Sequence, residues 1–168
     1  MNRLFPAVLA LLAVTMAGPA RAGQIVLETT SLTDIFAAYQ AICLDHIGDA
    51  TAQGRIAQAA PFDMKFDRTD DDGTVKYSNS RMFANVLDNG KTRNCMVTGR
   101  VPDETTLAQG IAVGDPVLGK LGEVYPMGNQ GQIWQRKGVG EVTVYLHIQQ
   151  TMPGQKIAAY MLGVESTK

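Results

Sequence analysis

The stretch SLTDIFAAYQAICLDHI at residues 31–47 has the pattern of an amphipathic helix. Its apolar residues recur every three or four positions, which places them on one face of an α-helix. Ser31 is a suitable N-cap with Asp34 three residues later, and Gly48 is a typical C-terminal stop. The sequence therefore predicts a helix over 32–47 with one core face. That face comprises Leu32, Ile35, Phe36, Tyr39, Ile42, Cys43 and Ile47.

The chain after residue 48 changes from helical to extended patterning. Asp49 is a suitable cap for a second predicted helix over 50–59, which ends before Pro61. Further along, apolar residues alternate with polar ones, most clearly in EVTVYLHIQQ at 141–150. The turn sequence Asp88-Asn89-Gly90 predicts a hairpin. The predicted strands are 62–67, 74–87, 92–101, 132–137, 141–150 and 156–165, with a third helix at about 103–112 and a Gly- and Pro-containing loop at 114–131.

This order of elements predicts an α+β fold. Strands joined by short turns pair antiparallel, so we expect an antiparallel sheet. The N-terminal helices would pack on this sheet, and one further helix would lie between two groups of strands. No linker-like segment divides residues 23–168, so we expect a single globular domain there.

Residues 1–22 have the three parts of a secretory signal peptide. Arg3 supplies the basic start, an apolar run extends from Leu4 to Ala17, and Ala20-Arg21-Ala22 is a small-x-small cleavage site. The apolar run is shorter than the ~20 residues that a membrane-spanning helix needs. We therefore expect cleavage before Gly23 and a periplasmic or secreted protein without a membrane span.

The charge of the exported chain gives no reason to expect nucleic acid as a partner. The full sequence has 15 basic and 16 acidic side chains, and removal of Arg3 and Arg21 leaves 13 basic side chains and a net charge of −3. Binding to DNA or to an anionic membrane surface draws on clustered positive charge. We expect instead another protein or an envelope component as the partner.

Two cysteines, Cys43 and Cys95, remain after export. An even number of cysteines in an oxidising compartment favours a disulfide, and a redox-active C-x-x-C motif is absent from the sequence. Cys95 shares one face of the predicted strand 92–101 with Val97 and Val101, and Cys43 lies on the core face of the first helix. The sequence therefore predicts a bond between helix and sheet.

The motif Phe36-Ala-Ala-Tyr-Gln-Ala-Ile-Cys43-Leu44, followed by Gly48-Asp49 and an alanine-rich helix, resembles a group of small exported proteobacterial proteins. The later Cys95-Met96-Val97 and the single Trp134 are similar to that group as well. The resemblance covers most of the chain after residue 22. It implies a helix-to-strand disulfide and a periplasmic location. We know of no activity assigned to the group, so it carries over no functional residue.

Three segments imitate cofactor or metal sites, and each departs from its motif. GDPVLGKL at 114–121 has Leu121 where a phosphate-binding loop needs Ser or Thr. DDDG at 70–73 lacks the first and last ligands of a calcium loop, because Arg68 and Asn79 occupy those positions. Cys43-Leu-Asp-His46 has zinc-like spacing, but its cysteine is better used in a disulfide. We therefore assign no cofactor, no metal ligand and no catalytic residue.

Four residues are candidates for a functional surface: His46, Tyr125, Trp134 and His147. His46 falls on the apolar face of the first predicted helix, where a partly buried structural histidine is the common case. A single tryptophan in a small domain is most often part of the core, although Trp134 could also stack on a ligand. Tyr125 belongs to a polar, glycine-containing loop, and His147 lies opposite the apolar face of its strand.

Two classes of function fit this sequence. The first is a non-enzymatic binding or inhibitor-type protein. The alternative is a small periplasmic hydrolase that uses carboxylate and histidine side chains, with His46 or His147 as the histidine. A pocket that contains a histidine and a carboxylate with a shifted pKa would favour the hydrolase. An exposed apolar patch would favour the binding protein.

We predict that mass spectrometry of the exported protein shows a chain that begins at Gly23. The small residues Ala20 and Ala22 satisfy the requirement of the signal peptidase. An exported fraction that retains Met1 would contradict this prediction.

Overall fold

The computed structural model describes residues 27–129, 131–137 and 141–165. The predicted signal peptide and its cleavage site lie outside these residues. The described residues have an α+β fold with an antiparallel sheet, as the sequence predicts.

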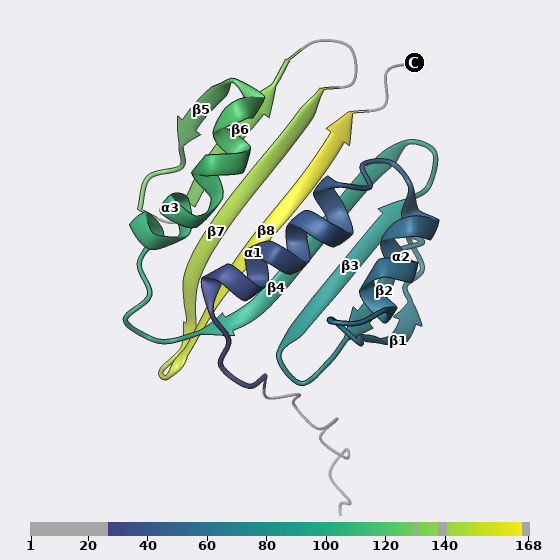
Figure 1. The fold of residues 1–168 in the computed structure, drawn as a ribbon, viewed down its shortest axis with the longest axis horizontal. Helices are drawn as coiled ribbons and strands as arrows, with labels where there is room; N and C mark the ends of the chain where they lie inside the picture. The colour runs from purple at the N-terminus through teal and green to yellow at the C-terminus, as the bar shows by residue number, and fades with distance from the viewer. Residues whose placement is uncertain (1–26, 130, 138–140, 166–168) are drawn as a thin grey trace, which may run out of the picture.

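The sheet has eight strands in the order β1-β2-β3-β4-β8-β7-β6-β5, and every neighbouring pair is antiparallel. Two meanders of four strands each therefore meet at the pair β4–β8 in the centre (Figure 1). The strands are β1 (Lys65–Thr69), β2 (Val75–Ser78), β3 (Met82–Asp88), β4 (Thr92–Val101), β5 (Glu123–Pro126), β6 (Gly131–Arg136), β7 (Val142–Met152) and β8 (Gln155–Glu165).

The three described α-helices, α1 (Leu32–Tyr39), α2 (Ala50–Gln58) and α3 (Leu107–Leu118), lie on the same face of the sheet (Figure 1). The central α1 lies over β4 and β8, while α2 lies over the first meander and α3 over the second. Each meander is thus preceded by its own helix, and α1 covers the line where the two meanders meet. The topology repeats in the two halves, although the sequence contains no recognisable internal repeat.

Glycines on the strands and helices allow these close approaches. A Cβ atom on Gly99 of β4 would lie 2.8 Å from the side chain of Ile35 in α1. A Cβ atom on Gly110 of α3 would lie 2.9 Å from Leu146 and Ile148 of β7. Distances under about 3 Å require a neighbouring group to shift, so a larger residue at either position would push a helix away from the sheet.

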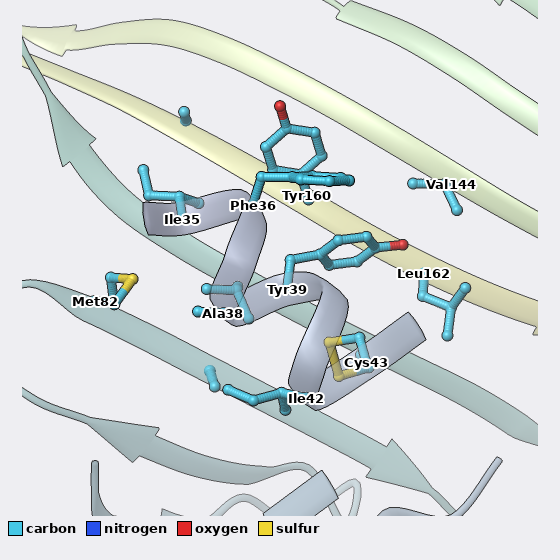
Figure 2. Packing of buried hydrophobic residues seen from close by; sticks show 14 of the residues in the cluster. Ile35, Phe36, Ala38, Tyr39, Ile42, Cys43, Met82, Val144, Tyr160 and Leu162 are labelled. Atoms are coloured by element: carbon cyan, nitrogen blue, oxygen red, sulfur yellow. A yellow bond between two sulfur atoms is a disulfide. The ribbon is translucent and has the colours of Figure 1, made fainter. Parts of the chain in front are cut away.

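Three aromatic rings form the centre of the core (Figure 2). The ring centroid of Tyr160 lies 5.5 Å from that of Tyr39 and 5.1 Å from that of Phe36. The hydroxyl of Tyr160 donates a hydrogen bond of 2.8 Å to the carbonyl of Gly110. Burial raises the pKa of both phenols well above the ordinary value, so both stay neutral. These contacts connect α1 and α3 to the central strand β8.

The first helix begins as predicted and ends earlier. The side chain of Ser31 accepts a hydrogen bond of 3.0 Å from the backbone N–H of Asp34. The α-helix ends at Tyr39, a π-helical turn continues it over Gln40–Leu44, and residues 45–48 form a turn. The prediction of a helix over 32–47 is therefore wrong at its end, because the wider π turn replaces the last α-helical turn while it keeps Ile42 and Cys43 buried.

The predictions for the second half of the chain need one larger correction. The third helix runs over Leu107–Leu118 instead of 103–112, and it takes in the first residues of the predicted loop 114–131. Thr106 and Gln109 form a capping box at its start. Tertiary packing overrides the low helix propensity of Gly114 and Pro116, since this last turn buries Leu118 against the core.

Two further strand predictions are wrong in their bounds. Phe62 and Met64 precede β1, which begins at Lys65 instead of residue 62. The predicted strand 74–87 is two strands, β2 and β3, because Asn79 forms a turn between them. Its side-chain oxygen accepts hydrogen bonds of 2.8 Å from the backbone N–H groups of Arg81 and Met82. Such side-chain bonds favour a turn over a continuous strand.

Cys43 and Cys95 form a disulfide between the π turn and β4, with their Cα atoms 5.5 Å apart. Both residues are buried, and the bond closes a segment that includes α2 and the strands β1, β2 and β3. In the chain-entropy model, such a cross-link stabilises the protein by restricting the unfolded chain.

We predict that Cys43→Ser lowers the free energy of unfolding by about 2–4 kcal/mol. The variant removes a cross-link between residues 52 positions apart, so the conformational entropy of the unfolded chain rises. Urea denaturation without reductant measures this loss. Cys95→Ser is the matched control and should cause a similar loss, while the double variant should cause little more than either one. Additive losses, or thiol labelling of both cysteines in the native protein, would show that the bond does not form.

Candidate functional site

The face of the sheet opposite the helices is the candidate functional site. Along β4, Cys95, Val97 and Gly99 point to the covered face and are buried. Met96 and Thr98 alternate with them, point to the other face and remain half-buried. None of the described helices lies on this second face (Figure 1), which we call the uncovered face.

The strand register aligns eight residues, one from each strand, across the uncovered face. Directly paired residues in antiparallel strands share a face and lie in contact, so these residues form a continuous row. We call it the central row. From β1 to β5 it consists of Arg68, Lys76, Asn85, Met96, Met161, Tyr145, Ile133 and Tyr125.

The central row has two chemically different ends. Its polar end on β1–β3 consists of Arg68, Lys76 and Asn85. Its apolar end extends over five strands, from Met96 on β4 to Tyr125 on β5. Contiguous apolar side chains on a surface are one of the features by which binding surfaces are found.

A hollow of about 430 Å³ lies at the apolar end. We call it the methionine hollow, because Met96, Met127 and Met161 all line it, together with Tyr145, His147 and Ile157. Among the described residues that line it, none carries a carboxylate. The hydroxyl of Thr98, which also lines it, is buried and has no hydrogen-bond partner among the described residues. A bound molecule could satisfy this group.

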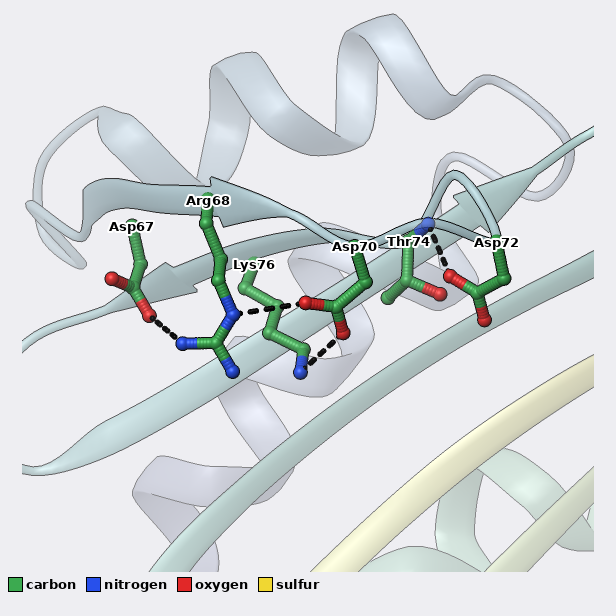
Figure 3. A network of polar contacts seen from close by, with 6 residues as sticks. All are labelled: Asp67, Arg68, Asp70, Asp72, Thr74 and Lys76. Atoms are coloured by element: carbon green, nitrogen blue, oxygen red, sulfur yellow. Dashed lines mark hydrogen bonds and ion pairs between the residues drawn. The ribbon is translucent and has the colours of Figure 1, made fainter.

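The polar end is an internally paired network of charges (Figure 3). Nε of Arg68 donates to Asp70 at 2.9 Å, and Nζ of Lys76 lies 2.5 Å from the other oxygen of Asp70. Nη1 of Arg68 also lies 3.3 Å from Asp67. Hydrogen bonds from Lys76 and then from Arg68 lower the pKa of Asp70. The carboxylate of Asp70 is therefore held by cations of this chain.

The opposite edge of the face holds a second small cluster. Nζ of Lys137 lies 2.8 Å from Glu123 and donates a hydrogen bond of 3.1 Å to the hydroxyl of Tyr125. That hydroxyl in turn donates to Glu123. The contact with Lys137, followed by that with Tyr125, lowers the pKa of Glu123. The cluster fixes the orientation of the Tyr125 ring at the end of the central row.

The structure divides the four sequence candidates between the two faces. His147 and Tyr125 both lie on the uncovered face, in the methionine hollow and at the end of the central row. Trp134 is fully buried on the covered face, where its Nε1 donates a hydrogen bond of 2.8 Å to Asp115. Trp134 is therefore a core residue and not a stacking platform.

His46 also lies away from the uncovered face, and only its predicted position on a helix is wrong. It belongs to the turn after the π-helical segment instead of the apolar face of a helix, and it is half-buried. Its carbonyl accepts a hydrogen bond of 3.0 Å from the side chain of Gln53 in α2. His46 and His147 therefore do not belong to one site, and the sulfur of Cys43, bonded to Cys95, is not free to join His46 as a ligand.

Sequence reasoning missed the methionines of the hollow. The shared face of Cys95, Val97 and Val101 in 92–101 implied that Met96 lies on the opposite face, whereas 156–165 is apolar on both faces and gave no such indication for Met161. What the alternation could not show is that β4 and β8 are neighbours with Met96 opposite Met161. Met127 reaches the hollow from the turn between β5 and β6, which no periodic pattern describes.

Comparison with protein-family models, with curated proteins and with solved structures gave no match. The resemblance to the group of exported proteins therefore rests on its sequence motifs alone. Within the described part of the chain, no helix has the length and apolar character required to span a bilayer.

We predict that Lys76→Met raises the pKa of Asp70 toward its ordinary value, because the variant removes the main hydrogen-bond donor that favours the charged form. Carbon-detected NMR titration of the carboxyl groups measures the shift. Because folding lowers the pKa of Asp70, the interaction stabilises the folded protein at higher pH. This stabilisation is lost as the pH falls through the pKa of Asp70. Lys65→Met on the same β-ribbon is the control and should leave this titration unchanged; an equal shift in both variants would contradict the assignment.

Proposed function

We propose that this protein is a non-enzymatic binding protein of the periplasm and that the uncovered face of its sheet is the binding surface. The observation that supports this most strongly is the apolar end of the central row, where apolar side chains from five adjacent strands lie in contact without a covering helix. The predicted signal peptide and the disulfide between Cys43 and Cys95 are consistent with an oxidising compartment.

The dimensions of the apolar end favour an elongated partner segment. Strands in a sheet lie about 4.8 Å apart, so the four intervals from Met96 to Tyr125 span about 19 Å. An amphipathic helix of about 13 residues has this length. We therefore propose that the occupant is the apolar face of a helical segment of another envelope protein.

The side chains of the apolar end suit such an occupant. Methionine has three rotatable bonds and a polarisable sulfur, so Met96, Met127 and Met161 can adapt to the shape of an apolar partner. Tyr145 and Tyr125 offer rings with few rotatable bonds, which lose little conformational entropy when they are covered. The charged residues beside them, Glu123 and Lys137, are paired with each other.

The hydrolase alternative finds less support in this geometry. His147 lies in a hollow to which the described part of the chain contributes no carboxylate, and His46 lies on the other side of the sheet. The acidic residues of the polar end, Asp67 and Asp70, are paired with Arg68 and Lys76. A general acid or base needs a carboxyl or imidazole group within reach of a substrate pocket.

We predict that a photoreactive amino acid at position 145 cross-links the mature protein to a discrete partner in the periplasm. The same amino acid at position 51 is the control, because Thr51 is exposed on α2. Adducts from position 145 and none from position 51 are the expected result. Equal adducts from both positions would contradict the proposed surface.

The identified partner then allows a quantitative test. Tyr145→Ser and Ile133→Ser should each weaken its binding to the purified protein by tenfold or more, because each removes apolar area from the centre of the contact. Thr51→Ser should leave the affinity unchanged. Thermal unfolding checks that all three variants fold, and unchanged binding of folded Tyr145→Ser would contradict the proposal.

A further inference from the structure

The methionine hollow concentrates oxidisable sulfur on the proposed binding surface. Met96, Met127 and Met161 all line it. The two cysteines of the chain, Cys43 and Cys95, are bonded to each other and buried on the covered face, so no thiol competes for an oxidant. The thioethers of methionine are therefore the sulfur groups of this protein that react with an oxidant.

The three methionines of the hollow are accessible from solvent, whereas the methionines of the core are not. Met127 in the β5–β6 turn is 46% exposed, and Met96 and Met161 are half-buried on the uncovered face. By contrast, Met64 and Met82 are each 2% exposed and belong to the core on the helix side. Oxidation of sulfur follows exposure, so an oxidant in solution reaches the hollow before it reaches the core.

We propose that Met96, Met127 and Met161 form an oxidative modification site, and that their conversion to methionine sulfoxide by hydrogen peroxide weakens partner binding. A lone pair of the thioether sulfur attacks one peroxide oxygen, so an S–O bond forms while the O–O bond breaks. The departing hydroxide takes up the remaining proton and leaves as water. The sulfur loses two electrons in this step, and the peroxide gains them.

Sulfoxide formation changes the chemical character of the apolar end of the central row. A thioether is apolar and polarisable, whereas a sulfoxide is polar and accepts hydrogen bonds from water. An apolar partner that covers a sulfoxide removes these hydrogen bonds without replacing them, which costs free energy. Met96 and Met161 are directly paired across β4 and β8, so their oxidation places two such groups side by side at the centre of the sheet.

Oxidation of the hollow leaves the fold intact. Met96 and Met161 point away from the helices and do not belong to the buried cluster that forms the core. The buried Met64 and Met82 keep their thioethers. The step is also reversible, because a dithiol reductant converts the sulfoxide back to the thioether, with a disulfide in the reductant and water as the other products. The modification therefore switches the surface of a protein that stays folded.

Peptide mass spectrometry locates the modified residues after the folded mature protein is treated with dilute hydrogen peroxide. We expect one added oxygen atom at each of Met96, Met127 and Met161. Their oxidation should be about tenfold or more faster than that of Met64 and Met82, because the latter two are buried. Oxidation of Met96 and Met161 that is as slow as that of Met82 would overturn the proposal.

Retention on a hydrophobic-interaction column measures the apolar character of the folded surface without a partner. Peroxide treatment should shorten the retention of the wild-type protein. Met152→Leu is the matched control and should respond like the wild type, because Met152 is exposed but lies outside the hollow.

The triple variant Met96→Leu/Met127→Leu/Met161→Leu should keep most of its retention after the same treatment, because leucine is apolar and has no sulfur to oxidise. Thermal unfolding checks that the variants fold and that the oxidised wild type keeps its midpoint. An equal loss of retention in the wild type and in the folded triple variant would contradict the proposal.

The switch rests on the proposed function, and cross-linking from position 145 distinguishes the failure of one from the failure of the other. Peroxide treatment of the otherwise wild-type protein should reduce the partner adduct about tenfold or more, whereas the triple leucine variant should keep it. Met96→Gln/Met161→Gln introduces polar side chains of similar length and should lose the adduct without any oxidant. Absence of adducts from the untreated protein would contradict the proposed function. Adducts that persist after complete oxidation of the three methionines would overturn the switch.

Discussion

The pairing of β4 with β8 is the constraint on which the rest of the structure depends. It joins two meanders of four strands that would otherwise be separate sheets, and ten residues of each strand take part in it. Helix α1 lies over this pair, and the disulfide from Cys43 to Cys95 connects the end of the helical segment to β4. The two halves of the chain therefore share one core, whose centre is the stacked pair of Tyr39 and Tyr160.

The same pairing determines the chemistry of the uncovered face. Side chains alternate along a strand, so the register that places Val97 opposite Tyr160 in the core also places Met96 opposite Met161 on the other face. A shift of one residue in β8 would expose Tyr160, and a shift of one residue in β4 would expose Val97. Core packing thus specifies which residues form the uncovered face. The apolar end of the central row therefore has a defined arrangement although none of the described helices covers it.

The local parts of this arrangement could be predicted from the sequence, and the long-range parts could not. Alternation in 92–101 located β4 to the residue, Asp88-Asn89-Gly90 located its hairpin with β3, and Asp49 located the start of α2. The extent of α3 was missed because Gly114 and Pro116 have low helix propensities. Burial of Leu118 against the core nevertheless favours a helix up to this residue. The methionine hollow was missed because its residues come from four separate segments whose neighbourhood depends on strand order. Alternation alone predicted that His147 lies opposite the buried face of β7. The predicted helical position of His46 was wrong, because the helical segment ends before this residue.

The two ends of the central row differ in charge. At the polar end Arg68 and Lys76 are already satisfied by Asp67 and Asp70, so a charged partner would have to break existing ion pairs to bind there. Exposed ion pairs of this kind add little stability, but they leave the polar end with little unbalanced charge to attract a ligand. The surface that we propose for binding is therefore the apolar end, where thioethers, a phenol and one imidazole line the same hollow. Thioether sulfurs and aromatic rings hydrogen-bond only weakly to water, so covering them with an apolar partner surface would be favourable.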